Sequence, residues 1–181
     1  MRVKDMVLLS LLSAMAFVSA IFIKVPIMPS AAFLKFEIKD AIILIAGIIY
    51  GPLPAFEVSS IVSLLEMMTI GGSGPIGFVM NVLSTSSFVC TASVVYKFRR
   101  TWKGLLTGLA SGCVMMTASM LLWNYIITPY FMGVPREIVA SMLLTVFLPF
   151  NLIKGAANSV IALLYMKPLL AVISAVNFYD D

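Results

Sequence analysis

The sequence predicts an all-α integral membrane protein, a six-transmembrane-helix bundle that forms a single membrane domain over residues 1–181. Hydrophobic residues make up 61% of the chain and charged residues only 11%, and the mean hydropathy is +1.08. Soluble domains carry about 25% charged residues, so this composition is typical of a chain that lies in lipid. At about 20 residues a span, the chain provides for five or six helices joined by short loops.

The first predicted span covers residues 6–23 and follows a short basic start at Arg2 and Lys4. Residues 14–16, Ala-Met-Ala, resemble a signal-peptidase cleavage site. Apolar residues continue through this point to Ile23 with no polar region before it, so we expect an uncleaved anchor rather than a signal peptide.

The second and third predicted spans cover residues 40–50 and 55–70. The segment Gly-Pro-Leu-Pro at 51–54 halts the second span, because proline cannot donate a backbone hydrogen bond within a helix. The third span ends at the glycine-rich run 71–75, which predicts a turn.

The last three predicted spans cover residues 76–95, 105–129 and 138–164. Pro149 lies inside the sixth span and is expected to kink it, since the proline ring removes one helical hydrogen bond.

Positive charges orient these spans. Arg2 and Lys4 precede the first span, four basic residues lie within 97–103 between the fourth and fifth spans, and Lys167 follows the sixth. With six spans these segments share one side, which the positive-inside rule makes cytoplasmic, so we expect a multi-pass protein of the cell membrane with both termini in the cytoplasm. Topology alone explains the 97–103 cluster, with a nucleic-acid or lipid site as the alternative; no nucleic-acid partner is expected.

The first loop, residues 24–39, reads KVPIMPSAAFLKFEIK and is long for a compact domain, where loops of this length are often functional. Its Lys24, Lys35 and Lys39 would lie on the outer side of the membrane, which conflicts with the positive-inside rule unless the loop has a special task. Residues 33–38 partly alternate apolar and charged side chains, as in a half-buried strand. We expect this outer loop to fold back over a ligand pocket at the outer mouth of the bundle; the alternative is an interfacial loop with an aromatic anchor.

Several chemistries are excluded. The chain has no histidine, and therefore no histidine base, catalytic triad or histidine-ligated metal. Cys90 and Cys113 stand alone in apolar helices, where we expect packing rather than a disulfide or a metal site. No phosphate-binding P-loop motif occurs. Glu57 and Glu66 are expected at membrane ends, with a catalytic or proton-carrying role as the alternative. The sequence therefore indicates a protein that is not an enzyme.

One polar pair, Asn151 and Lys154, interrupts the apolar sixth span within the motif PFNLIKG at 149–155. The two residues lie within one helical turn and on one face. A lysine at the centre of a membrane helix costs about 2.5–3.5 kcal/mol, which favours a partner, a cavity or a ligand beside it. The alternative is a lysine near the helix end whose ammonium reaches the headgroups.

These features together resemble the substrate-binding S components of energy-coupling factor (ECF) vitamin transporters, and more narrowly the riboflavin-specific S components. Chain length and the six-span layout match over almost the whole sequence. Four motifs carry the resemblance: FLKFEIKD at 33–40, YGP at 50–52, NYIITPY at 124–130 and PFNLIKG at 149–155.

The resemblance implies high-affinity binding of riboflavin from outside, as the transported ligand and with no cofactor or metal. It also implies uptake through a membrane scaffold subunit that carries two ATPase subunits, which agrees with the missing P-loop. Ala16 and Ala20 match the Ala-x-x-x-Ala face by which the family docks on the scaffold. The residues expected to bind riboflavin are Phe33, Leu34, Lys35, Phe36, Glu37, Asp40, Asn124, Tyr130, Asn151 and Lys154.

Two alternatives remain at this stage. The first is an S component for another vitamin. The second is a self-sufficient secondary transporter or channel, with Glu57, Glu66 and Lys154 along an ion path. No inverted repeat of broken helices supports the second.

Overall fold

A computed structural model describes residues 2–28, 31–70 and 72–179 of the chain, with side chains described as far as residue 171. Residues 29 and 30 of the predicted first loop and residue 71 of the predicted glycine-rich turn lie outside this range. The elements, in order, are α1 (Val3–Phe22), β1 (Lys24–Pro26), β2 (Lys35–Glu37), α2 (Lys39–Tyr50), α3 (Pro52–Thr69), α4 (Gly74–Arg99), α5 (Trp102–Met132), α6 (Arg136–Met142), the π-helical turn η1 (Leu143–Phe147) and α7 (Leu148–Tyr179).

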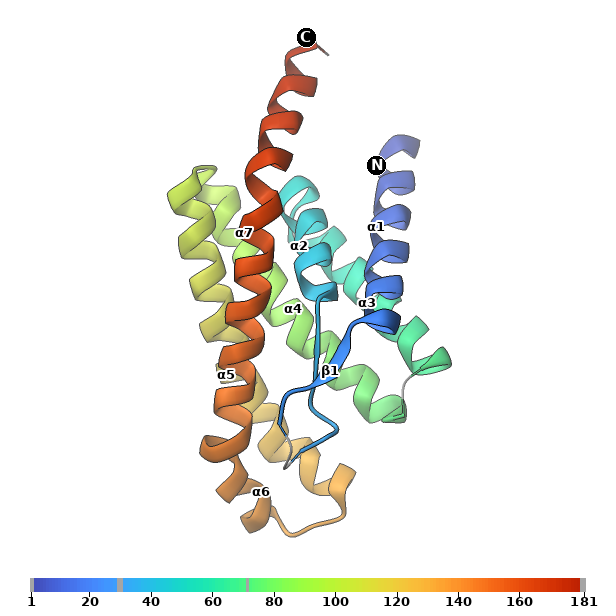
Figure 1. Ribbon diagram of the computed structural model, residues 1–181, viewed down its shortest axis with the longest axis vertical. Helices are drawn as coiled ribbons and strands as arrows, with labels where there is room; N and C mark the ends of the chain where they lie inside the picture. Colours follow the sequence, from blue (N-terminus) through green and yellow to red (C-terminus); the bar gives the residue numbers. More distant parts are fainter. Residues whose placement is uncertain (1, 29–30, 71, 180–181) are drawn as a thin grey trace.

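The helices form one elongated bundle, and the start of α1 and the end of α7 lie towards the same end of it (Figure 1). Among the described residues, four segments are long and apolar enough to cross a membrane: α1, α4, α5 and the continuous stretch Arg136–Ala171. The prediction of a helical membrane protein therefore holds. One addition is the short hairpin of β1 and β2, which the all-α class does not include.

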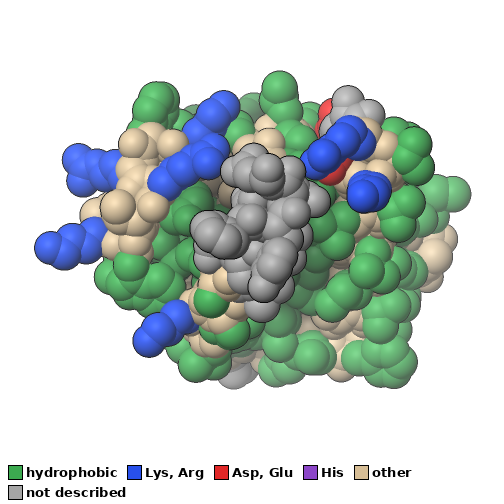
Figure 2. All heavy atoms as spheres, turned by 90° about the horizontal axis from the view of Figure 1, so that it is seen from above, with side chains coloured by type: hydrophobic (Ala, Val, Ile, Leu, Met, Phe, Trp, Pro, Cys, Tyr) green, Lys and Arg blue, Asp and Glu red, His purple; other side chains and the backbone are tan. Residues whose placement is uncertain are grey.

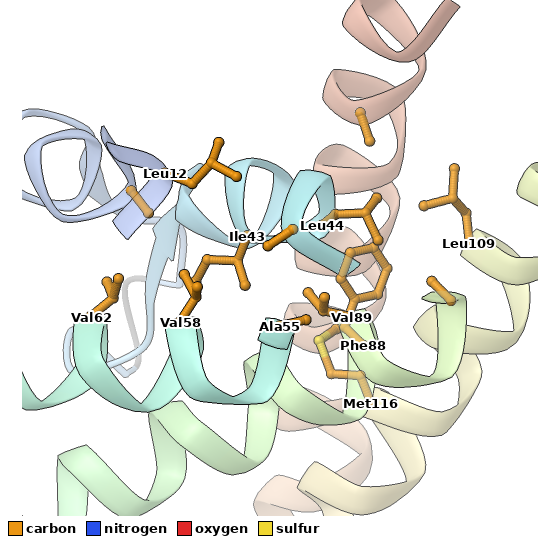
Figure 3. Packing of buried hydrophobic residues seen from close by; sticks show 14 of the residues in the cluster. Leu12, Ile43, Leu44, Ala55, Val58, Val62, Phe88, Val89, Leu109 and Met116 are labelled. Carbon is orange, nitrogen blue, oxygen red and sulfur yellow. The ribbon is translucent and has the colours of Figure 1, made fainter. Parts of the chain in front are cut away.

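Helix α2 is the shortest of the predicted spans and lies in the interior. Its 12 residues extend about 18 Å, less than the ~30 Å of a hydrocarbon core. Ile43 and Leu44 are fully buried and belong to one apolar cluster with residues of α3 and α4 such as Val58 and Phe88 (Figure 3). Packing on several sides, rather than length, therefore fixes this helix in the bundle.

Two glycines set the spacing between α4 and α5. A Cβ added at Gly112 would lie 2.6 Å from the Phe88 carbonyl oxygen, and one added at Gly108 would lie 2.8 Å from that of Ala92. Neither position has room for a side chain. Small residues at a membrane-helix interface let the backbones approach closely, and here they bring two long helices together.

Prolines mark the helix boundaries in ways that differ from the predictions. Pro52 occupies the first turn of α3, where a missing N–H costs nothing, so the third helix starts at 52 rather than 55. Pro149 lies in the first turn of α7, directly after the π-helical turn at 143–147, so it does not interrupt the interior of that helix. Helices α4 and α5 extend several residues beyond their predicted ends.

The partial alternation at residues 33–38 is confirmed as a strand. β2 pairs antiparallel with β1, with Lys24 opposite Glu37 and Val25 opposite Phe36. This hairpin connects α1 to α2 (Figure 1). The register places Lys24 and Glu37 as direct neighbours, and these two residues enter the site described next.

Candidate ligand-binding site

A cavity of about 460 Å³ lies between the hairpin segment and helices α3, α4, α5 and α7. Its size is within the range of 300–1,000 Å³ typical of small-molecule sites. It is lined by Lys24, Ala32, Phe33, Leu34, Lys35, Glu37, Ser63, Glu66, Met67, Ile70, Gly72, Ser73, Gly74, Ile76, Gly77, Phe78, Met80, Asn81, Ser84, Met120, Asn124, Thr128, Phe131, Phe150, Asn151 and Lys154.

Aromatic side chains form one wall of this cavity. The ring of Phe33, from the loop before β2, meets that of Phe131 on α5 edge-on, with 5.6 Å between centroids. Phe147 lies behind Phe33 at 6.3 Å, and Phe150 is buried and lines the cavity. Edge-to-face pairs of this kind hold the loop against α5 and leave ring surface available for a flat apolar ligand.

Four charged residues form a first buried cluster beside the hairpin. Lys24 Nζ lies 2.6 Å from Glu37 Oε1. Lys39 Nζ, with no exposed surface, lies 2.7 Å from Glu37 Oε2 and also contacts Glu66 Oε1. Asn81 Nδ2 donates to Glu66 Oε2 at 3.2 Å. Two ammonium groups thus offset two carboxylates, which is the condition for burying charges at tolerable cost.

The pKa of Glu37, in strand β2, reflects this setting. Burial alone raises the pKa of a carboxyl, but the positive charges of Lys39, Lys154 and Lys24 outweigh it and lower the pKa to about 2. Glu37 is therefore ionised at every physiological pH and holds the hairpin to the helices through ion pairs.

A second cluster centres on the lysine that the sequence singled out. Lys154 Nζ lies 3.1 Å from Asp40 Oδ2 and donates to Ser84 Oγ at 3.2 Å. Thr85 donates its hydroxyl to Asp40 Oδ1 at 2.7 Å. Lys154 is 4% exposed. The alternative of a lysine reaching to the headgroups is therefore wrong: the ammonium has a buried carboxylate partner and faces the cavity.

Amides complete the polar lining. Asn124 donates to the Met120 carbonyl and accepts from the Thr128 hydroxyl at 2.8 Å. Asn151 donates to the Phe147 carbonyl at 2.7 Å. Both are buried, and each is oriented by its own helix before any ligand arrives. Such pre-positioned donors and acceptors discriminate between ligands, because an unmatched polar group in an apolar cavity costs about 1–3 kcal/mol.

The structure brings most of the predicted site residues to this cavity. Seven line it: Phe33, Leu34, Lys35, Glu37, Asn124, Asn151 and Lys154.

The other three predicted site residues lie outside the lining. Asp40 stands behind Lys154 as its partner. Phe36 alternates with Lys35 and Glu37 along β2 and so points to the opposite face. Tyr130, 74% exposed, is two residues from Thr128, which puts it on the other side of α5.

Sequence reasoning missed Glu66, Asn81 and Ser84. Glu66 does lie in the last turn of α3, but its carboxylate is buried with lysine partners instead of meeting the interface as expected. Glu57 is exposed. The signal was the set of lysines that conflicted with the positive-inside rule, since Lys24 and Lys39 both pair with carboxylates beside the hairpin.

Ala16 and Ala20, expected to dock on a scaffold, are fully buried. α1 turns this face towards α2 and α3 and exposes Leu11, Met15 and Val18 instead. In this chain the two alanines thus pack inside the bundle.

A helical membrane bundle with a preformed cavity of this kind is the architecture of a membrane protein that binds a small molecule. Residues 4–166 match the model of the family described as ECF transporter, substrate-specific component, and the chain belongs to that family. The predicted resemblance is thereby confirmed, and the protein belongs to a transport system and is not an enzyme.

Individual relatives agree with this family. The chain is 30% identical over 177 residues to "Riboflavin transporter FmnP" of Bacillus subtilis (strain 168), covering 92% of this chain and 93% of the relative. It is 32% identical to "Riboflavin transporter RibU" of Staphylococcus aureus (strain TCH60), covering 92% and 90%. A solved S component of a bacterial ECF transporter superposes with a TM-score of 0.82 at 32% identity, over 94% of this chain and 97% of that one.

Proposed function

We propose that this chain is the riboflavin-binding S component of an ECF-type transporter, acting as one membrane domain. The observation that carries the proposal is the cavity, which is lined both by aromatic side chains and by buried, pre-oriented polar groups. Riboflavin has a flat, largely apolar ring system with a polar edge and a hydroxylated tail, so it needs both kinds of surface. The names of the relatives support this ligand.

The cavity supplies matching groups for each part of riboflavin. Phe33, Phe131 and Phe150 offer surface to the isoalloxazine ring. Asn124 and Asn151 both donate and accept, whereas Lys154 only donates, so together they satisfy the ring edge or the tail hydroxyls. Asp40, which is not part of the cavity lining, holds the Lys154 ammonium in place through its ion pair.

We propose six spans with both termini in the cytoplasm, α2 and α3 joining the four long apolar segments. Lys and Arg side chains gather at the end of the bundle seen in Figure 2, where α4 ends and α5 begins, in agreement with the positive-inside rule. On this orientation the hairpin is an outer lid, tied to α7 because Asn158 donates to the Glu37 carbonyl at 3.2 Å. A cysteine at Gly133 should react with an impermeant thiol reagent from outside and one at Thr101 should not; the reverse pattern contradicts the orientation.

Uptake then requires a membrane scaffold and two ATPase subunits. Because Ala16 and Ala20 are buried, we propose that they hold α1 against its own neighbours, and that the exposed face of α1 with Met15 meets the scaffold. Ala16→Trp should then impair folding and riboflavin binding together, whereas Met15→Trp should spare binding and reduce ATP-dependent uptake. Intact binding with lost uptake in Ala16→Trp would restore the docking role of the buried alanines.

The absorption spectrum of the purified protein tests the ligand. Protein from flavin-containing cells should emerge yellow, and the stripped protein should quench riboflavin fluorescence in a titration. Thiamine and biotin serve as controls that should not compete. A colourless protein that fails to quench riboflavin would contradict the proposed ligand, and riboflavin uptake into liposomes by this chain alone, without ATP, would contradict the transporter class.

A further inference from the structure

A second cavity, of about 490 Å³, opens at the end of the bundle opposite the hairpin, where the turn from α4 to α5 meets α7. It shares no residue with the ligand cavity. Its lining residues are Tyr96, Arg100, Thr101, Trp102, Lys167 and Leu170.

Two cations from separate parts of the chain converge on this cavity. Arg100 caps the end of α4, where its backbone N–H donates to the Tyr96 carbonyl, and Lys167 lies on α7. Both are exposed. Within the part of the chain whose side chains are described, no ion pair involves either residue. Around the other cavity, by contrast, each buried lysine pairs with a carboxylate.

Membrane topology explains why these segments are basic, but it does not explain why Arg100 and Lys167 line the same cavity. The positive-inside rule requires only an excess of Lys and Arg in a loop. It is satisfied equally by Lys97 and Lys103, which are exposed and do not line the cavity. The pairing of Arg100 with Lys167 around one hollow is a property of the tertiary structure.

The remaining lining residues fit the boundary between lipid and water. Trp102 is 43% exposed at the start of α5, and Tyr96 and Leu170 provide apolar surface beside it. Thr101 accepts from the Gly104 backbone N–H, which leaves its hydroxyl hydrogen to donate. Tryptophan and tyrosine favour the headgroup level of a bilayer, and arginine favours phosphate because its planar fork of donors matches the oxygens.

We propose that this cavity binds the phosphate of an anionic phospholipid headgroup, with Arg100 and Lys167 as its ligands and Trp102 at the glycerol level. Basic pockets between membrane helices are known to hold anionic headgroups. The site needs only a position at a membrane surface, so it does not depend on riboflavin as the transported ligand.

Native mass spectrometry of the full chain in neutral detergent tests this site. Dioleoylphosphatidylglycerol is the anionic probe, and dioleoylphosphatidylcholine, which is zwitterionic and has no net charge, is the comparison that should bind more weakly. Each cation near a membrane surface contributes enough for about a fivefold change in affinity, so R100Q/K167Q should bind phosphatidylglycerol about 30-fold more weakly. The matched control K97Q/K103Q removes the same net charge outside the cavity and should weaken binding less than about threefold. A cooperative thermal unfolding transition in detergent, close to that of the wild type, confirms that each variant is folded.

Each outcome decides the proposal. Equal losses in the two double variants would show diffuse attraction to a basic surface and overturn the site. Competition by free sn-glycerol 1-phosphate at the same concentration would identify a soluble phosphate as the ligand instead of a lipid. Unchanged lipid binding with lost uptake in R100Q/K167Q would assign the cavity to the scaffold subunit. If the double variant does not fold, Arg100→Gln and Lys167→Gln are measured singly, and a loss of about fivefold in each supports the site while no loss overturns it.

Discussion

Around the ligand cavity the two buried lysines, Lys39 and Lys154, pair with carboxylates. At the opposite end of the bundle Arg100 and Lys167 are exposed and have no ion pair among the residues whose side chains are described. The difference follows from solvation. A buried ammonium loses water and must regain an equivalent interaction inside the protein, while an exposed one keeps its hydration or meets lipid phosphates. Similar residues thus build a rigid site at one end and an adaptable surface at the other.

The largest effect is expected from breaking the pairing at the hairpin end. Lys39→Met leaves the carboxylates of Glu37 and Glu66 without their shared buried partner, which should lower the free energy of unfolding by about 3–5 kcal/mol. Thermal and denaturant unfolding in detergent measure it. The double variant Lys39→Met/Glu66→Gln removes one charge of each sign and should recover part of the loss; a single variant as stable as wild type would show that the cluster is dispensable.

The second largest effect is expected from lowering the pH, which should reduce the stability contributed by Glu37 at the hairpin end. Because the pKa of Glu37 is lowered from 4.5 to about 2, the stability from its charge is fully present above about pH 4.5 and is lost as pH falls towards 2. The stability difference between wild type and Glu37→Gln should therefore be constant from pH 7 to 5 and shrink below that. A difference that already shrinks between pH 7 and 5 would contradict the lowered pKa.

A smaller and more local effect is expected at the amides of the cavity. Asn151→Leu keeps the approximate size and removes the polar head, so riboflavin affinity should fall by about 1–3 kcal/mol with little change in unfolding temperature. Lys154→Met should weaken binding similarly. It should also destabilise the protein, since it leaves the buried Asp40 carboxylate without its ionic partner. Fluorescence quenching and thermal unfolding separate the two outcomes, and unchanged affinity in both variants would make these residues structural.

The smallest effect on stability belongs to the opposite end. Lys97→Gln changes an exposed charge on the last turn of α4 and should alter the free energy of unfolding by less than about 0.5 kcal/mol. The same assay as for Lys39→Met applies. If Lys97→Gln lowered the free energy of unfolding as much as Lys39→Met does, the proposed difference between the two ends would be wrong.

The sequence by itself determined the class of fold and much of the site. Apolar runs, glycine–proline breaks and the charge bias predict a helical membrane protein, because hydropathy and backbone breakers act locally. The motifs at 33–40 and 149–155 marked Phe33, Glu37, Asn151 and Lys154, which the structure brings to one cavity. Local patterns sufficed where residues of a motif share one face of one element, as Asn151 and Lys154 do on α7 and Lys35 and Glu37 do on β2.

The tertiary structure alone decided which charges meet. The pairs Lys39–Glu66 and Lys154–Asp40 each join two different helices, so no local spacing of residues predicts them. It also decided that Ala16 faces inward, since a small residue suits either an internal contact or a partner's helix. The convergence of Arg100 and Lys167 has the same origin. Helix formation is local, whereas the choice of facing surfaces depends on how all the helices pack at once.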